Sequence, residues 1–223
     1  MIQEDYEQLS MDSWRVFRII SEFVDGIETM TDLGPSVSVF GSARTEPTSK
    51  YYDMGVEMAQ KVAEKGFAII TGGGRGLMEA ANRGAKAAGG KSCGLGIDLP
   101  FEIEQNPYVD HKYNLNFRYF FIRKVMFMRY AQAFVVLPGG FGTLDEFFEA
   151  LTLIQTRKTK FFPIYLMGTD YWSSLVDWLK ETALENKMIS KEDLNLWKLS
   201  DDPDEVANSI EKNFKNRKNH KNF

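Results

Sequence analysis

The feature that most constrains the fold of this chain is a glycine-rich turn between a buried strand and a helix. Residues 133–136 are uniformly apolar, which is typical of a strand covered on both faces. The sequence LPGGFGTLDE follows at residues 137–146, and the apolar spacing of residues 146–154 predicts a helix. Glycines let a backbone approach a phosphate closely, and the N–H groups of a helix start point toward it. The segment therefore predicts a site for a phosphorylated small molecule, with the Thr143 hydroxyl as a donor and the Glu146 carboxylate beside the ligand.

Two further segments have the same order of strand and small-residue turn. Residues 66–71 read as a buried strand, residues 72–76 (GGGRG) as a turn, and residues 77–85 as a helix. Residues 37–40 read as another strand, and the small residues 41–43 follow it. The carboxyl ends of parallel strands meet at one edge of an open α/β sheet. We therefore expect the three turns to converge there.

The remaining chain alternates between helical and strand patterns. Helical spacing covers residues 51–65, and further strands are expected at 93–97 and 161–167. This alternation predicts a single α/β domain over residues 1–223: a Rossmann-like, doubly wound parallel sheet of five or more strands, with helices on both faces. Residues 98–117 lack either pattern and read as a long loop.

Helices are also expected at both ends of the chain. Residues from about 5 to 30 form an amphipathic pattern, and its apolar positions are Trp14, Phe17, Ile20, Val24 and Ile27. Two or three helices are expected over about residues 171–215, with Trp172, Trp178 and Trp197 as packing aromatics.

Composition excludes several kinds of protein. The 27 basic and 31 acidic residues give a net charge of −4, so no overall positive field attracts nucleic acid. The single cysteine, Cys93, and the two histidines cannot supply a disulfide within the chain, a thiolate cluster or a multi-histidine metal site. The first residues do not read as a signal peptide, and no apolar run approaches the ~20 residues that span a bilayer. We expect a cytoplasmic protein without a membrane or nucleic-acid partner.

Two common nucleotide motifs are not matched. The turn at residues 72–76 lacks the third glycine of G-x-G-x-x-G, because Leu77 occupies that place. The run 84–92 resembles a phosphate-binding Walker loop, but Ala85 replaces its first glycine and the run precedes a strand. These departures disfavour a dinucleotide dehydrogenase and an ATPase.

The charged side chains admit two interpretations from the residues alone. Glu146 and Glu149 are either groups that act on a ligand or ordinary acids stabilised in the first turn of a helix. Arg123 and Lys124 are either site residues or solvated charges on the helix predicted over residues 119–130.

Three motifs in order along the chain resemble those of the Lonely Guy (LOG) family. Residues 72–78 are similar to its GGGxxGLM turn, Arg123 and Lys124 to its Arg-Lys pair, and residues 138–146 to its PGGxGTxxE motif. The resemblance runs from about Val37 to Trp172. Residues 119–122 differ from the lead of the pair in plant members, and the match looks closer to the broader bacterial branch.

The resemblance implies an activity and a set of site residues. Members are often labelled lysine decarboxylases, but the family activity is phosphoribohydrolase: a nucleoside 5'-monophosphate, AMP-like or a cytokinin riboside monophosphate, yields free base and ribose 5-phosphate. Arg123 and Glu146 would be catalytic. Substrate would be bound by residues of the three turns and the pair, namely Gly41, Ser42, Gly73, Gly74, Lys124, Gly139, Gly140, Phe141, Gly142, Thr143, Leu144 and Asp145. Glu79, Asn82 and Glu149 are weaker candidates.

The same resemblance bears on cofactors and assembly. No metal and no pyridoxal phosphate are expected, because no lysine is marked as a Schiff-base former. A homodimer or a larger even homo-oligomer is expected, through the helices over residues 119–130 and 146–155. The alternative function is a non-catalytic carrier of a phosphorylated ligand, such as a nucleotide or molybdenum cofactor. Presence of both Arg123 and Glu146 favours the enzyme, since a carrier needs the glycine turns but not that pair.

Overall fold

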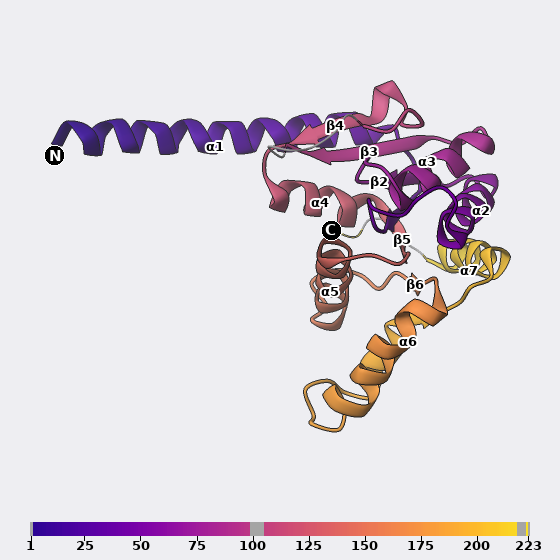
Figure 1. Cartoon of the computed structure of the whole chain (residues 1–223). Coiled ribbons are helices and arrows are strands. Elements are labelled where there is room, and N and C mark those ends of the chain that lie inside the picture. Colours follow the sequence, from indigo (N-terminus) through magenta and orange to yellow (C-terminus); the bar gives the residue numbers. More distant parts are fainter. Residues whose placement is uncertain (1, 99–104, 218–221, 223) are drawn as a thin grey trace.

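A computed structural model describes residues 2–98, 105–217 and 222, and the chain forms one seven-stranded parallel sheet between two layers of helices (Figure 1). The strands are β1 Ser36–Phe40, β2 Ala68–Thr71, β3 Ser92–Ile97, β4 Asn114–Phe117, β5 Ala131–Val136, β6 Ile164–Leu166 and β7 Trp197–Leu199. The α-helices are α1 Ile2–Thr31, α2 Lys50–Glu64, α3 Leu77–Ala87, α4 Phe120–Tyr130, α5 Phe141–Gln155, α6 Thr169–Trp178 and α7 Pro203–Asn216.

The strand order β4-β3-β2-β1-β5-β6-β7 makes the sheet doubly wound. From β1 the chain builds outward through β2 and β3, and it then returns to add β5 on the other side of β1. Ligands of open α/β sheets bind beyond the strand carboxyl ends at such a reversal. The predicted Rossmann-like fold class, with parallel strands and helices on both faces, is confirmed.

Alternate residues of each strand supply the two cores, because successive side chains point to opposite faces. Val37 and Val39 of β1 pack with helices α2, α3 and α7, whereas Phe40 packs with α1, α4, α5 and α6. Phe40 lies with its ring centroid 4.9 Å from those of Phe127 and Phe134. The buried strands explain the uniformly apolar runs in the sequence.

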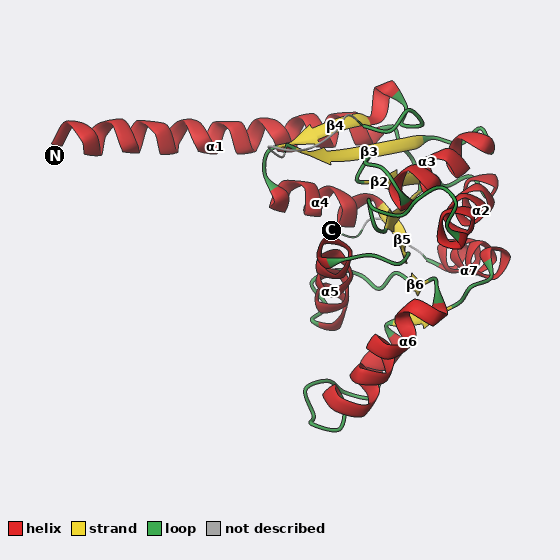
Figure 2. Cartoon of the chain, in the orientation of Figure 1, coloured by secondary structure: helices red, strands yellow, loops and turns green. Residues whose placement is uncertain are grey.

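Several boundaries differ from the sequence predictions (Figure 2). The region expected as a loop over residues 98–117 contains β4, and its residues 99–104 lie outside the described part of the chain. Strand β7 occupies a region that was expected to be helical. Both strands are short, at 4 and 3 residues, and lie at the sheet edges, so neither shows a long apolar run. Trp178 is exposed, while Trp172 and Trp197 are buried as expected.

Helix α1 projects well beyond the sheet, and only its carboxyl-terminal part lies against the body of the protein (Figure 1). The apolar positions predicted for its buried face, Trp14 to Ile27, are instead exposed. The face that packs on the core carries Ile19, Phe23 and Met30. The helix therefore has two apolar faces, and periodicity alone did not separate them. In the part of the chain that is described, no helix is both long and apolar enough to cross a membrane.

Candidate functional site

The three small-residue turns meet at one edge of the sheet and are hydrogen-bonded to each other. The Ser42 backbone N–H donates to the Pro138 carbonyl at 2.9 Å, and the Leu77 N–H donates to the Ser42 carbonyl at 2.9 Å. The turn after β1 thus joins the turns after β5 and β2, as the sequence predicts. Gly76 has a φ of +67°, and a Cβ there would lie 2.3 Å from the Ser42 carbonyl oxygen, so this junction requires glycine.

The turn before α5 exposes backbone at a helix start. Gly140 precedes the first helical residue, Phe141, and the side chain of Phe141 is 92% exposed. Gly142 is exposed as well, whereas the Thr143 side chain is buried against Gly139. The first N–H groups of a helix have no acceptor within it, so this end of α5 can receive an anion.

Helix α5 begins five residues earlier than the sequence pattern suggested, at Phe141 rather than Glu146. Glu146 and Glu149 are therefore not first-turn acids, and the first turn of α5 contains no acidic residue. The PGGFGT segment supplied few apolar side chains, so its helical part was read as turn. The interpretation of both glutamates as ordinary helix-start acids is wrong.

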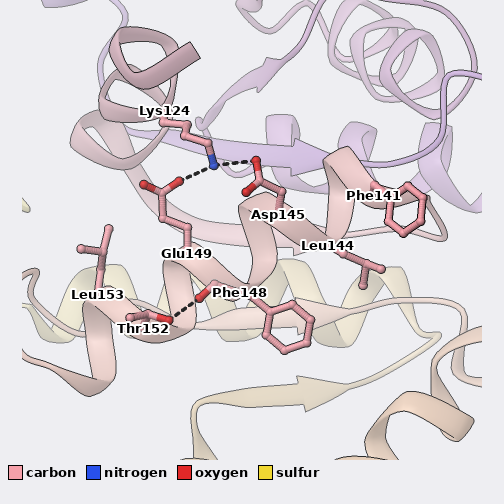
Figure 3. A pocket seen from close by; sticks show the side chains of 8 residues that line it. All are labelled: Lys124, Phe141, Leu144, Asp145, Phe148, Glu149, Thr152 and Leu153. Atoms are coloured by element: carbon pink, nitrogen blue, oxygen red, sulfur yellow. Dashed lines mark hydrogen bonds and ion pairs between the residues drawn. The ribbon is translucent and has the colours of Figure 1, made fainter.

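Lys124 of α4 joins three carboxylates of α5 (Figure 3). Its Nζ lies 2.6 Å from Glu149 Oε2, 2.8 Å from Asp145 Oδ2 and 3.7 Å from Glu146 Oε1. Burial alone would lower the pKa of Lys124, but its hydrogen bonds with Asp145 and Glu149 raise it above the ordinary value. Lys124 is therefore a fixed ammonium ion between α4 and α5.

Glu146 is buried, with a side chain only 10% exposed. Burial raises its pKa from 4.5 to about 7, against the opposing effect of the Lys124 and Arg123 charges. Among the described residues, none forms a hydrogen bond with Glu146 Oε2. The expectation that the helix start holds Glu146 ionised is wrong, because loss of water outweighs the nearby positive charge. A carboxyl with this pKa exchanges its proton near neutral pH.

Arg123 is fixed between β3 and the turn after β2. Its Nε donates to the Leu95 carbonyl at 2.7 Å, and its guanidinium carbon lies 5.3 Å from the centre of the Phe127 ring. One guanidinium nitrogen sits where a Cβ on Gly72 would lie. Arg123 is thus held beside the glycine turn, where its charge acts on Glu146.

Asn82 and Glu79 have structural partners. Asn82 is fully buried; its Oδ1 accepts from Thr71 Oγ1 at 2.6 Å, and its Nδ2 donates to Ser92 Oγ at 2.8 Å. Glu79 accepts from the Tyr52 hydroxyl at 3.0 Å. These contacts fit the interpretation that both side chains support the fold around the turn.

Asn106 and Gln105, which sequence reasoning missed, contact the turn after β2. Asn106 Nδ2 donates to the carbonyls of Gly73 and Gly74 at 3.0 and 2.9 Å. Gln105 lies against Gly73 and Gly94, with its Oε1 buried and without a hydrogen-bond partner in the described structure. Both residues sit in a segment without a periodic pattern, so the sequence held no signal for this contact. Gly73 and Gly74 are therefore partly covered by this segment.

An open groove runs along the exposed side of α5 beside this cluster (Figure 3). It is lined by Lys124, Phe141, Leu144, Asp145, Phe148, Glu149, Thr152 and Leu153. Lys124, Asp145 and Glu149 border it with charge, while Phe141, Leu144 and Phe148 supply apolar surface (Figure 3). The groove brings together the predicted binding residues Phe141, Leu144 and Asp145.

The described residues include no cluster of three or more His, Cys, Asp or Glu side chains arranged to hold a metal ion. Cys93 is buried in β3, and burial raises the pKa of its thiol. It is an inert core residue, as expected from its apolar surroundings.

Comparison with known proteins adds relatives of named activity. The model of a family described as possible lysine decarboxylase matches residues 78–210. The chain is similar to the probable cytokinin riboside 5'-monophosphate phosphoribohydrolase LOGL5 of Oryza sativa subsp. japonica, with 30% identity over 67% of this chain and 61% of the rice protein. It is also similar to the cytokinin riboside 5'-monophosphate phosphoribohydrolase of Rhodococcoides fascians, with 28% identity over 67% of this chain and 76% of that protein. The chain thus matches less than two thirds of the rice protein's length.

Among solved structures, the chain is similar to the molybdenum cofactor carrier protein of Chlamydomonas reinhardtii. The TM-score is 0.58 with 21% sequence identity, and the match covers 82% of this chain and 99% of that one. At this identity the likeness shows a shared fold.

Proposed function

Because this chain belongs to the LOG family, whose model is described as possible lysine decarboxylase, we propose that it hydrolyses the N-glycosidic bond of a nucleoside 5'-monophosphate. The observation that carries the proposal is the buried carboxyl of Glu146, 3.7 Å from Lys124, in the helix that starts at the PGGFGT turn. The names of the relatives support the same reaction class.

The phosphate binds at the start of α5. Exposed backbone at Gly140 and Gly142 and the free N–H groups of this helix end provide donors for an anion. The turns after β1 and β2 border the same edge, so Gly41, Ser42, Gly73 and Gly74 line the nucleotide. Phosphate anchoring fixes the ribose relative to Glu146, which converts binding energy into orientation.

Hydrolysis breaks the bond between C1' of the ribose and the base nitrogen, and water supplies the hydroxyl on C1'. The base leaves with the electron pair and takes up a proton, so the products are free base and ribose 5-phosphate. The transition state resembles an oxocarbenium ion, which a nearby carboxylate stabilises. Glu146 provides this negative charge and orients the water.

The two cations have separate parts in this scheme. Lys124 favours the ionised form of Glu146 and contacts the nucleotide. Arg123, held by the Leu95 carbonyl and the Phe127 ring, lies beside the ribose and offsets charge that develops on the leaving base. Lysine decarboxylation fits this site poorly, because a Schiff-base lysine must lose its proton, whereas the partners of Lys124 raise its pKa.

The base is an adenine or a substituted adenine in this proposal, and the relatives' names make cytokinin riboside 5'-monophosphates candidates. The second candidate function is a carrier of a phosphorylated ligand, favoured by the fold shared with the molybdenum cofactor carrier protein. A carrier does not need the Arg123–Glu146 pair.

Incubation of purified protein with AMP separates the two functions. The enzyme releases adenine and ribose 5-phosphate in equal amounts, and liquid chromatography detects both. A carrier returns the AMP intact after equilibrium dialysis. Inclusion of a cytokinin riboside 5'-monophosphate in parallel tests the substrate preference.

A further inference from the structure

Helix α1 carries an apolar surface that the rest of the described chain leaves uncovered. The outer stripe, defined here as Trp14, Phe17, Ile20, Val24 and Ile27, has exposed fractions of 65, 65, 52, 54 and 38%. The opposite face, with Ile19, Phe23 and Met30, already packs on the core. Two aromatic and three aliphatic side chains in one line exceed the scattered apolar residues that monomers commonly expose.

The spacing of the outer stripe is nearly symmetric about a point between Ile20 and Ser21. In an antiparallel pair of α1 helices centred there, Trp14 faces Ile27 of the second copy and Phe17 faces Val24. Intervals of three and four residues are those by which two helices interdigitate along a common seam. One face can therefore pack against itself under two-fold symmetry.

The charges beside the stripe also fit an antiparallel second copy. Arg18 and Asp25 lie seven residues apart on one side of the helix, and both are exposed. In the centred pair, each Arg18 comes within about two residues, roughly 3 Å along the axis, of Asp25 in the other copy. A parallel pair would place Arg18 beside Arg18 instead.

We propose that the outer stripe of α1 binds a second copy of this chain in an antiparallel helix pair. The helix projects from the sheet, so the second copy can approach without meeting the strands or the site at their carboxyl ends (Figure 1). A membrane surface suits the stripe less well, because Asp25 and Glu28 flank it and oppose anionic lipid. The pairing stands on α1 alone and is independent of the proposed activity.

Light scattering of purified protein tests the pairing through its mass. The substitutions Phe17→Asp and Val24→Asp, made together, place acids in the seam and should halve the mass relative to wild type. Both side chains are exposed, so circular dichroism should report an unchanged fold. Equal masses for wild type and this variant up to ~100 µM would overturn the proposal.

Charge exchange and cross-linking test the orientation. Arg18→Asp alone should shift the association to higher concentration, and addition of Asp25→Arg should restore it. A Phe17→Cys, Val24→Cys double variant should form a covalent dimer on oxidation, while neither single variant does, since identical positions lie ~10 Å apart along the axis. The native Cys93 is buried and does not compete. A covalent dimer of Phe17→Cys alone contradicts the antiparallel arrangement.

A membrane partner is the competing outcome. Wild type should stay in the supernatant when it is centrifuged with vesicles of phosphatidylcholine and phosphatidylserine. Sedimentation with these vesicles that the Phe17→Asp, Val24→Asp variant loses, together with an unchanged mass in solution, would overturn the second-copy proposal.

Discussion

Lys124 Nζ lies 3.7 Å from Glu146 Oε1, farther than the 2.6 and 2.8 Å that separate it from Glu149 and Asp145. The lysine is thus held by two acids at the border of the groove while its charge still acts on the buried one. Asp145 and Glu149 fix the cation, and Glu146 keeps an oxygen without a hydrogen-bond partner among the described residues. This arrangement leaves Glu146 available to a ligand.

The pKa of Glu146 predicts the pH dependence of activity. If the ionised carboxylate is required, kcat/KM should rise as pH increases through about 7, since burial raises the pKa to that value. Lys124→Met should move the midpoint to higher pH, because the ammonium ion lowers this pKa. Rates of AMP cleavage between pH 5 and 9 measure both profiles. Identical midpoints for the two proteins would show that Lys124 does not act on the titrating group.

The same pKa predicts a stability difference. The folded protein binds the Glu146 proton more tightly than the unfolded chain, so this group contributes stability below pH 4.5 that is lost as pH rises to about 7. Glu146→Gln has no such loss. Its unfolding free energy relative to wild type should increase across this window by roughly 3 kcal/mol. Urea unfolding at pH 5 and pH 8 measures the change, with the exposed Glu57→Gln as control. A constant difference at both pH values would rule out a raised pKa.

Fold prediction succeeded where elements are long and buried. Strands β1, β2, β3 and β5 have every residue buried, so their apolar runs were visible in the sequence. Strand β4 alternates exposed and half-buried polar residues such as Asn114 and Asn116 and forms only through pairing with β3. Tertiary pairing of that kind has no local signal.

Prediction of the site followed the same division. Adjacency of the three turns follows from parallel strand order, and the Ser42–Pro138 and Leu77–Ser42 hydrogen bonds realise it. The protonation of Glu146 depends on how much water its neighbours exclude, which the sequence does not report. Contacts of Asn106 with Gly73 and Gly74 arise between segments more than thirty residues apart.

Two neighbouring glycines of the α5 turn should respond differently to a methyl group. A Cβ on Gly139 would lie 2.1 Å from the buried Thr143 Oγ1, so Gly139→Ala should destabilise the protein by roughly 1–3 kcal/mol. A Cβ on Gly140 meets nothing within 4 Å, so Gly140→Ala should fold normally but bind AMP several-fold more weakly, where the methyl group meets phosphate. Thermal unfolding and calorimetric titration with AMP distinguish these outcomes. Unchanged AMP affinity in Gly140→Ala would place the phosphate elsewhere.

Exposed aromatics on α4 and α5 predict an assembly. Phe120 and Phe121 are 52 and 48% exposed, and Phe148 is 36% exposed. We expect a homodimer or a larger even oligomer through these helices, and the Phe17→Asp, Val24→Asp variant of α1 should remain at least dimeric. Light scattering at micromolar concentration measures the mass. A monomer mass for that variant would argue against an interface on α4 and α5.

Cleavage of AMP by Glu146→Gln, compared with wild type and Glu57→Gln, tests the central claim most directly. Loss of a single electrostatic group at a transition state typically costs roughly 10²–10³ in rate. Adenine release by Glu146→Gln should fall at least that far while AMP binding largely persists, Arg123→Ala should also be severely impaired, and Glu57→Gln should match wild type. Near-normal adenine release by Glu146→Gln would contradict the account and leave Glu146 as a buried structural acid.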